Sequence, residues 1–155
     1  MSFLVRVCHA LQHQSVNYAL VGGHAVALHG AVRGTIDIDL VIEFTLENLK
    51  TTEQVFKSLG LSSHLPLSAE YIFTHRETLI KERNLIAWSF ISLENPLEVV
   101  DLIISFDLQN QMVVEKNLAS GQVLRVLSKE DLITMKRASG RPQDLADVTA
   151  LQESE

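Results

Sequence analysis

The stretch VGGHAVALHGAVRGTIDIDLVI, residues 21–42, carries the pattern that decides the fold of this chain. It opens with the glycine pair Gly22 and Gly23 directly after an apolar run, and it closes with two aspartates that alternate with apolar residues. An alternation of period two predicts a β-strand. Asp37 and Asp39 then share one face of that strand about 6.5 Å apart, close enough for both to reach one cluster of cations.

The glycine pair predicts a turn that binds phosphate. A strand, two glycines and a short helical run over 24–29 would place backbone N–H groups at a helix N-terminus, where they attract anions. Glycines also let the backbone approach a ligand without a Cβ in the way. The two carboxylates further on would repel each other when half-buried, and Mg²⁺, which prefers oxygen ligands, would relieve that repulsion. Because the P-loop pattern and the dinucleotide fingerprint do not occur, these features predict a nucleoside triphosphate site of another kind.

At these residues the chain resembles the nucleotidyltransferase superfamily related to DNA polymerase beta, and more narrowly its minimal and abortive-infection toxin-like members. The signature of that superfamily is a hydrophobic residue, Gly-Gly or Gly-Ser, a spacer, and Asp-x-Asp or Asp-x-Glu within a strand. Here it reads Val21-Gly22-Gly23 and then Asp37-Ile38-Asp39, and the likeness extends to the tail 136–147. The resemblance implies a mixed α/β (α+β) fold with a central mixed sheet of about four to five strands flanked by helices.

The resemblance also implies roles for individual residues. Asp37, Asp39 and Asp101 would be the metal ligands, and with Lys136 they would be the catalytic residues. Asp101 also stands out by itself, because an acid inside an apolar strand needs a partner or a function. The remaining candidates would bind the nucleotide together with Lys136: Gly22, Gly23, His24, Arg33, Thr35, Arg141 and Asp144.

Simpler interpretations remain for several of these residues. The Asp pair could be solvent-facing acids on an edge strand, and Asp101 could be an acid in a salt bridge. Lys136 could lie at the edge of the core, His24 could be packed or exposed, and Arg33 could pair with surface acids. The tail acids could be favoured by a helix dipole.

The function implied by the resemblance is Mg²⁺- or Mn²⁺-dependent transfer of a nucleoside monophosphate from a nucleoside triphosphate to a hydroxyl group. The acceptor would be tRNA, a protein side chain or a small molecule, and the toxin-like members imply a toxin–antitoxin or phage-defence system as one setting. Two alternatives stay open. One is a catalytically idle module of the same fold that acts as an antitoxin through a protein partner, and the other is a nucleotidyltransferase acting on a small molecule such as an antibiotic.

Composition limits the class of protein. The 155 residues suit a single domain over 1–155, and 46% hydrophobic with 21% charged residues is typical of a soluble globular protein. A net charge of −6 argues against a broad nucleic-acid-binding surface. Without an apolar run of transmembrane length or a signal-peptide pattern, we expect a cytoplasmic protein that does not bind membranes. Cys8, the single cysteine, is expected to be a core thiol.

The remaining pattern predicts elements along the chain. Ser2, Thr45 and Ser128 are expected to cap helices, and Pro142 is expected at the start of the last helix. The strands are expected at 17–21, 36–42, 86–93, 98–105 and 122–127, with 86–105 as a hairpin, and the helices at 3–14, 24–29, 46–59, 69–83 (helix or loop), 106–117, 129–139 and from 142 on.

Overall fold

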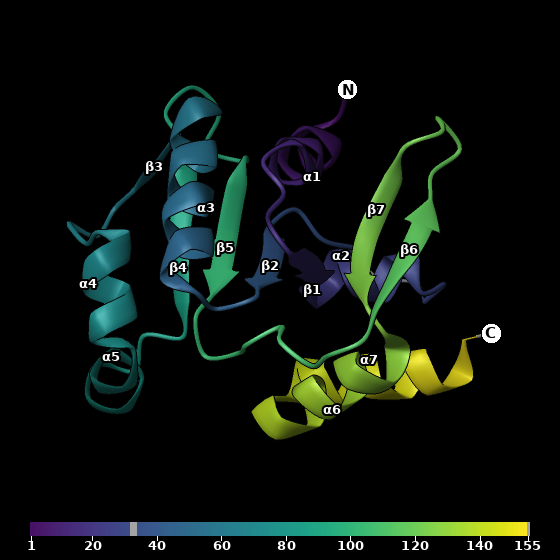
Figure 1. Ribbon diagram of the computed structural model, residues 1–155. Coiled ribbons are helices and arrows are strands. Elements are labelled where there is room, and N and C mark those ends of the chain that lie inside the picture. Colours follow the sequence, from purple (N-terminus) through teal and green to yellow (C-terminus); the bar gives the residue numbers. More distant parts are fainter. Residues whose placement is uncertain (32–33, 155) are drawn as a thin grey trace.

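The computed structural model describes residues 1–31 and 34–154, and these contain one seven-stranded mixed sheet with helices packed around it (Figure 1). The elements follow in the order α1 (Phe3–His13), β1 (Tyr18–Val21), α2 (Gly22–Leu28), β2 (Ile38–Ile42), α3 (Leu46–Ser58), β3 (Leu61–Ser63), α4 (Ala69–Thr74), α5 (Arg76–Arg83), β4 (Ala87–Ser92), β5 (Val99–Ile103), β6 (Val113–Asn117), β7 (Val123–Leu127), α6 (Lys129–Ser139) and α7 (Pro142–Glu153).

The strand order across the sheet is β3-β4-β5-β2-β1-β7-β6. The pairs β2/β5 and β1/β7 are parallel and the other neighbours are antiparallel. The predicted mixed sheet is therefore confirmed, and so is the β4–β5 hairpin. The expected four to five strands are too few, because the two edge strands β3 and β6 were not anticipated.

The predicted helix starts are confirmed by their caps. The side chains of Ser2, Thr45 and Ser128 each accept a hydrogen bond from the backbone N–H three residues further on. Pro142 lies in the first turn of α7, where its missing N–H costs nothing. Residues 69–83 form α4 and α5.

The helix expected over 106–117 is wrong. Residues 106–112 are irregular, and Val113–Asn117 forms the edge strand β6 antiparallel to β7. Leu108 is buried, and its backbone N–H donates to the carbonyl of Ile42 at 3.1 Å, so the irregular segment is tied to the end of β2. The four-residue spacing of Leu108 and Met112 resembles helical spacing, whereas pairing of β6 with β7 decides the structure.

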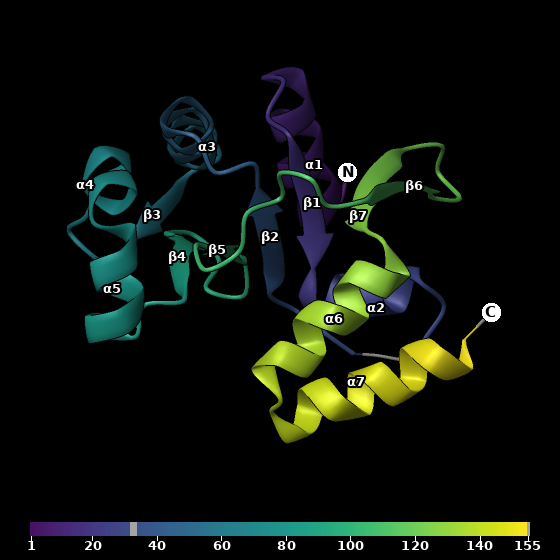
Figure 2. The ribbon, with the colours of Figure 1, turned by 60° about the horizontal axis from the view of Figure 1, so that its bottom comes forward.

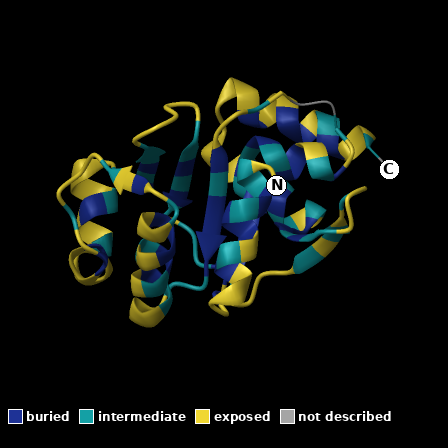
Figure 3. Ribbon diagram, turned by 90° about the horizontal axis from the view of Figure 1, so that it is seen from above, coloured by how far each residue is buried: buried dark blue, intermediate teal, exposed yellow. Residues whose placement is uncertain are grey.

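Burial is deepest in the middle of the sheet (Figure 3). All four residues of β1 are buried. Cys8 of α1 is also fully buried, in agreement with a core thiol, and burial raises its pKa to about 12. None of the described helices is both long and apolar enough to span a bilayer.

The hairpin β4–β5 has two unlike faces. On one face Trp88 and Phe90 are buried, and Phe90 packs edge-on against Phe56 of α3 with ring centroids 5.0 Å apart. On the other face the alternate residues are only partly buried. They are Ala87, Ser89, Ile91, Val99, Asp101 and Ile103. The acid-bearing face of the hairpin is therefore the more open one.

Candidate active site

Most of the predicted site residues line one cavity of about 660 Å³, a volume typical of nucleotide-sized ligands. The cavity lies where β1 ends, where β2 begins and beside β4 and β5, with α6 and α7 on its other side (Figure 2). The predicted residues that line it are Gly22, Gly23, Thr35, Asp37, Asp39, Asp101, Lys136, Arg141 and Asp144.

Strand pairing brings the two central carboxylates together. Asp39 of β2 and Asp101 of β5 are direct partners in the parallel register. Because neighbouring strands present paired residues on the same face, both carboxyl groups project into the cavity. Ser89, the partner of Asp101 on β4, donates a hydrogen bond of 2.5 Å from its hydroxyl to Asp101 Oδ1. Ser89, on the neighbouring strand β4, thus fixes the orientation of the Asp101 carboxylate.

The electrostatics of this cluster are those of crowded acids. Burial, followed by the charges of Asp101 and Asp37, raises the pKa of Asp39 to about 7, although Lys136 works in the opposite direction. A carboxyl group with that pKa is only partly ionised at neutral pH without a cation. The site therefore has a surplus of negative charge that a bound cation would offset.

The glycine turn is packed against one of these carboxylates. Gly22 has φ +68°, in the left-handed region, and a Cβ at this position would overlap the side chain of Asp39. A Cβ at Gly23 would lie 2.7 Å from Cβ of Thr35. Both positions therefore require glycine, and the turn, Thr35 and Asp39 form one closely packed unit.

The carboxylate oxygens of Asp37, Asp39 and Asp101 are the kind of ligand that a hard divalent cation prefers. They are not already arranged around an ion position. In the described ranges 1–31 and 34–154, no three acidic, histidine or cysteine side chains are grouped closely enough to hold an ion as they stand. Asp39 and Asp101 adjoin each other, and Asp37 is exposed and lines the same cavity. Since all three are oxygen donors in a site with excess negative charge, they fit Mg²⁺ or Mn²⁺.

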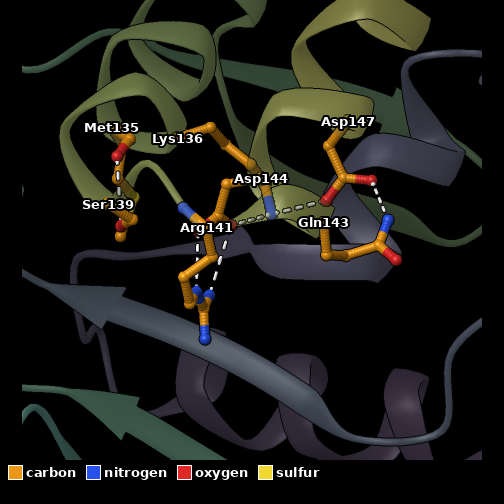
Figure 4. A network of polar contacts seen from close by, with 7 residues as sticks. All are labelled: Met135, Lys136, Ser139, Arg141, Gln143, Asp144 and Asp147. Atoms are coloured by element: carbon orange, nitrogen blue, oxygen red, sulfur yellow. Dashed lines mark hydrogen bonds and ion pairs between the residues drawn. The ribbon is translucent and has the colours of Figure 1, made fainter.

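An ion-pair network joins α6 and α7 beside the acids (Figure 4). Lys136 Nζ lies 2.8 Å from Asp147 Oδ2 and 3.5 Å from Asp144 Oδ1, and all three residues are at least 90% buried. Gln143 donates to the second oxygen of Asp147 at 3.0 Å. Lys136 is therefore engaged by two carboxylates of its own chain and is not a free cation facing the cavity.

Arg141 is held by the same network but is accessible. Its Nε lies 2.7 Å from Asp144 Oδ2, a second nitrogen lies 3.2 Å from Oδ1, and its side chain is 75% exposed. Burial acts to raise the pKa of Asp144, but the bonds and charge of Arg141 outweigh it and the pKa is lowered. Asp144 is thus an ionised carboxylate that orients the guanidinium of Arg141 at the cavity wall.

One predicted residue does not line the cavity, and another lies outside the described residues. His24 does not line it; its ring Nε2 lies 3.5 Å from the carbonyl of Ile36, and burial lowers the pKa of the ring. Arg33 lies outside the described residues. His29, which directly follows α2, is buried with Nε2 2.8 Å from the carbonyl of Leu127.

Several residues of the site were not predicted. Ser89 orients Asp101, Asp147 pairs with Lys136 and accepts from Gln143, and apolar side chains contribute to the cavity lining. A signal for Ser89 existed, because a hairpin that turns at Asn95-Pro96 places it opposite Asp101. Asp147 lies three residues after Asp144, so their helix face was visible in the sequence.

Comparison with known proteins identifies the fold. The lincosamide antibiotic adenylyltransferase LnuA, solved with lincomycin bound, aligns over 97% of this chain and 95% of its own, with 17% identity and a TM-score of 0.66. The antibiotic-resistance factor ANT(2'')-Ia aligns over 96% of this chain and 80% of its own, with 13% identity and a TM-score of 0.61. An antigenic nucleotidyltransferase-like protein from Paracoccidioides brasiliensis aligns over 96% and 73%, with 22% identity and a TM-score of 0.57.

No protein-family model and no curated protein matches the chain. The structural likeness nevertheless spans nearly the whole chain in each case, and it confirms the mixed α/β fold class predicted from the sequence. The chain therefore has the fold of the nucleotidyltransferases.

Proposed function

We propose that this chain is a nucleotidyltransferase, which moves a nucleoside monophosphate from a nucleoside triphosphate to a hydroxyl acceptor with the help of Mg²⁺ or Mn²⁺. The observation that carries the proposal is the pairing of Asp39 with Asp101 beside the Gly22 turn, in one cavity on a nucleotidyltransferase fold. A crowded acid pair without a cation is unfavourable, so its presence next to a glycine turn supports a role in binding metal and triphosphate.

The metal ligands in this proposal are Asp37, Asp39 and Asp101. A divalent cation bound there would offset charge on the triphosphate and would lower the pKa of the acceptor hydroxyl. The chain itself orients these ligands, through the packing of Gly22 on Asp39 and through the hydrogen bond from Ser89 to Asp101.

The remaining roles in this proposal are proton transfer, binding of the outer phosphates and stabilisation of the leaving group. The acceptor oxygen would form the bond to the α-phosphorus while the bond from that phosphorus to pyrophosphate breaks, and Asp101 would receive the hydroxyl proton. The backbone at Gly22 and Gly23 would hold the outer phosphates. The accessible guanidinium of Arg141 would stabilise the charge on the leaving pyrophosphate, with Lys136 behind it.

The finer assignments have unequal support. Relatives named for transfer to antibiotics favour a small-molecule acceptor over tRNA or a protein side chain. A place in the abortive-infection toxin-like branch, and with it a toxin–antitoxin role, is supported only by the sequence of the tail. We also propose that residues 1–155 act as one domain, because β1 and β7, from opposite ends of the chain, are neighbours in the sheet.

The test is a transfer assay. The protein is incubated with Mg²⁺ and with each labelled nucleoside triphosphate in turn, in the presence of pools of small alcohols, tRNA or protein. Adducts are detected by the added mass of one nucleotide. Asp39→Asn and Asp101→Asn should abolish transfer, whereas Glu115→Gln, an exposed carboxylate on the edge strand β6, should leave it intact.

Equal transfer by wild type and both aspartate variants would refute the proposal. Tight nucleotide binding with no transfer to any pool would instead favour the idle binding module.

A further inference from the structure

One wall of the cavity is apolar. Ile86, Ala87 and Ile103, which we call the β4–β5 ledge, line the cavity beside Asp101. Ala87 and Ile103 are direct partners across the hairpin, and Ile86 is 49% exposed. A single exposed isoleucine needs no explanation, but three apolar side chains side by side in the cavity lining form a surface that a ligand can cover.

The ledge adjoins the core, against which Ile103 packs, but none of its three residues is buried. Ala87 and Ile103 lie on the face of the hairpin whose residues are only partly buried, and Ile86 directly precedes β4 and is exposed, while Trp88, Phe90 and Leu102 fill the opposite face and are fully or almost fully buried. The hairpin is therefore already stabilised from its other side. The apolar residues at the cavity are available for binding.

The order of the strands places the ledge on the acceptor side of the acids. Across the sheet, β4 and β5 lie on one side of β2 and β1 lies on the other. Asp39 and Asp101 are thus between the glycine turn at the end of β1 and the ledge. In an in-line displacement the attacking oxygen approaches opposite the leaving group, so pyrophosphate held at the glycine turn requires an acceptor on the ledge side.

The charges of the cavity restrict the acceptor. Among its described lining residues, Lys136 and Arg141 are the cations, and both are in ion pairs with carboxylates of α7. The ledge itself carries no charge. A polyanion such as RNA depends on cations for its affinity, and this wall supplies none.

We infer that the β4–β5 ledge is the acceptor subsite, and that the acceptor is a low-molecular-weight alcohol with an apolar face and no negative charge. The inference rests on the proposed function, since it assigns the acceptor side of the same reaction. The acceptor lays its apolar face on Ile86 and Ile103, and its hydroxyl oxygen replaces pyrophosphate on the α-phosphorus while its proton passes to Asp101.

A binding experiment tests the position of the subsite. Protein with ¹³C-labelled isoleucine methyl groups is titrated with cyclohexylmethanol and, separately, with 4-(hydroxymethyl)cyclohexane carboxylate, which adds one negative charge to the same ring. The neutral alcohol should shift the methyl signals of Ile86 and Ile103 and leave buried Ile72 unchanged. The charged analogue should bind about tenfold more weakly or not at all. Equal shifts from both compounds, or none from the neutral one, would overturn the inference.

A kinetic experiment tests whether the ledge binds the acceptor during transfer. With the acceptor found in the transfer assay, Ile86→Ser and Ile103→Ser should each raise the acceptor KM about tenfold, because apolar contact is lost, while the nucleotide Kd stays within about twofold. Leu93→Ser, which alters an 84% exposed leucine just beyond the other end of β4, should change neither value.

The outcomes separate this inference from the proposed function. If the variants weaken nucleotide binding and leave the acceptor KM unchanged, the ledge holds the base and the inference is wrong. Transfer to tRNA in place of small alcohols would also overturn it. If wild type binds no nucleotide at all, the proposed function fails, whatever the alcohol titration shows.

Discussion

Gly22 lies directly against the carboxylate of Asp39, so closely that the turn has no room for a Cβ. Its φ of +68° adds a second requirement for glycine, because L side chains rarely adopt the left-handed region. The contact joins the end of β1 to β2, whose residues Val21 and Asp39 are partners in the antiparallel register. The glycine signature and the acid signature are therefore one structural unit.

We predict that Gly22→Ala damages both stability and site geometry. The left-handed backbone costs an alanine about 1–2 kcal/mol, and the overlap with Asp39 adds to that cost or displaces the carboxylate. The matched control is Gly60→Ala, since Gly60 has φ +80° and open space around its Cβ position. Urea unfolding should show a larger loss for Gly22→Ala than for Gly60→Ala, and only the former should weaken Mg²⁺-dependent nucleotide binding. Equal losses would mean that the contact with Asp39 is unimportant.

A second prediction concerns pH. The pKa of Asp39, which burial and the neighbouring acids raise from its ordinary 3.8 to about 7, means that the folded state binds more protons than the unfolded state between these two values. Stability in the absence of metal therefore falls as pH rises through this window. Asp39→Asn removes the penalty, so it should stabilise the protein more at pH 8 than at pH 4, with a difference of about 4 kcal/mol.

The measurement is chemical unfolding in EDTA at both pH values. Comparing wild type with variant at each pH cancels the other titrating groups, and Glu115→Gln serves as the exposed control. A stability difference between Asp39→Asn and wild type that is the same at both pH values would contradict the raised pKa.

Local patterns were enough for the inner elements of the fold. Short apolar or alternating runs bounded by turn residues predicted β1, β2, β4, β5 and β7, and serine or threonine caps predicted the starts of α1, α3 and α6. The edge strands β3 and β6 could not be predicted from local sequence patterns. Each is short and pairs on one side only, so its conformation depends on a partner strand.

The site residues that could be predicted are those that belong to one short sequence motif. Gly22, Asp37 and Asp39 stand within one stretch, whereas Ser89 joins them only through the hairpin register. The engagement of Lys136 by Asp147 depends on how α6 packs against α7, which no local pattern reveals. The apolar residues of the ledge were indistinguishable from core residues in the sequence.

We predict that Ser89→Ala lowers the rate of transfer without weakening nucleotide binding. Its hydroxyl fixes one oxygen of Asp101, and without that bond the carboxylate can rotate away from its position beside Asp39. The expected loss in kcat is about tenfold or more, at a stability cost of about 1 kcal/mol. Ser139→Ala is the control, because Ser139 lines the same cavity but bonds only to the Met135 carbonyl of its own helix. If the two substitutions lower kcat equally, Ser89 does not position Asp101 for transfer.

The final prediction concerns the buried ion pair between α6 and α7. Lys136→Met leaves the carboxylates of Asp144 and Asp147 buried without their shared cation, and should cost about 3 kcal/mol of unfolding free energy. Replacing both partners, with Lys136→Met and Asp147→Leu together, should recover a large part of that loss because no uncompensated charge remains. Lys57→Met, at the exposed pair with Glu53, should change stability by less than about 0.5 kcal/mol. If the double variant is as unstable as the sum of the single variants, Lys136 and Asp147 act independently, and the network does not hold the lysine.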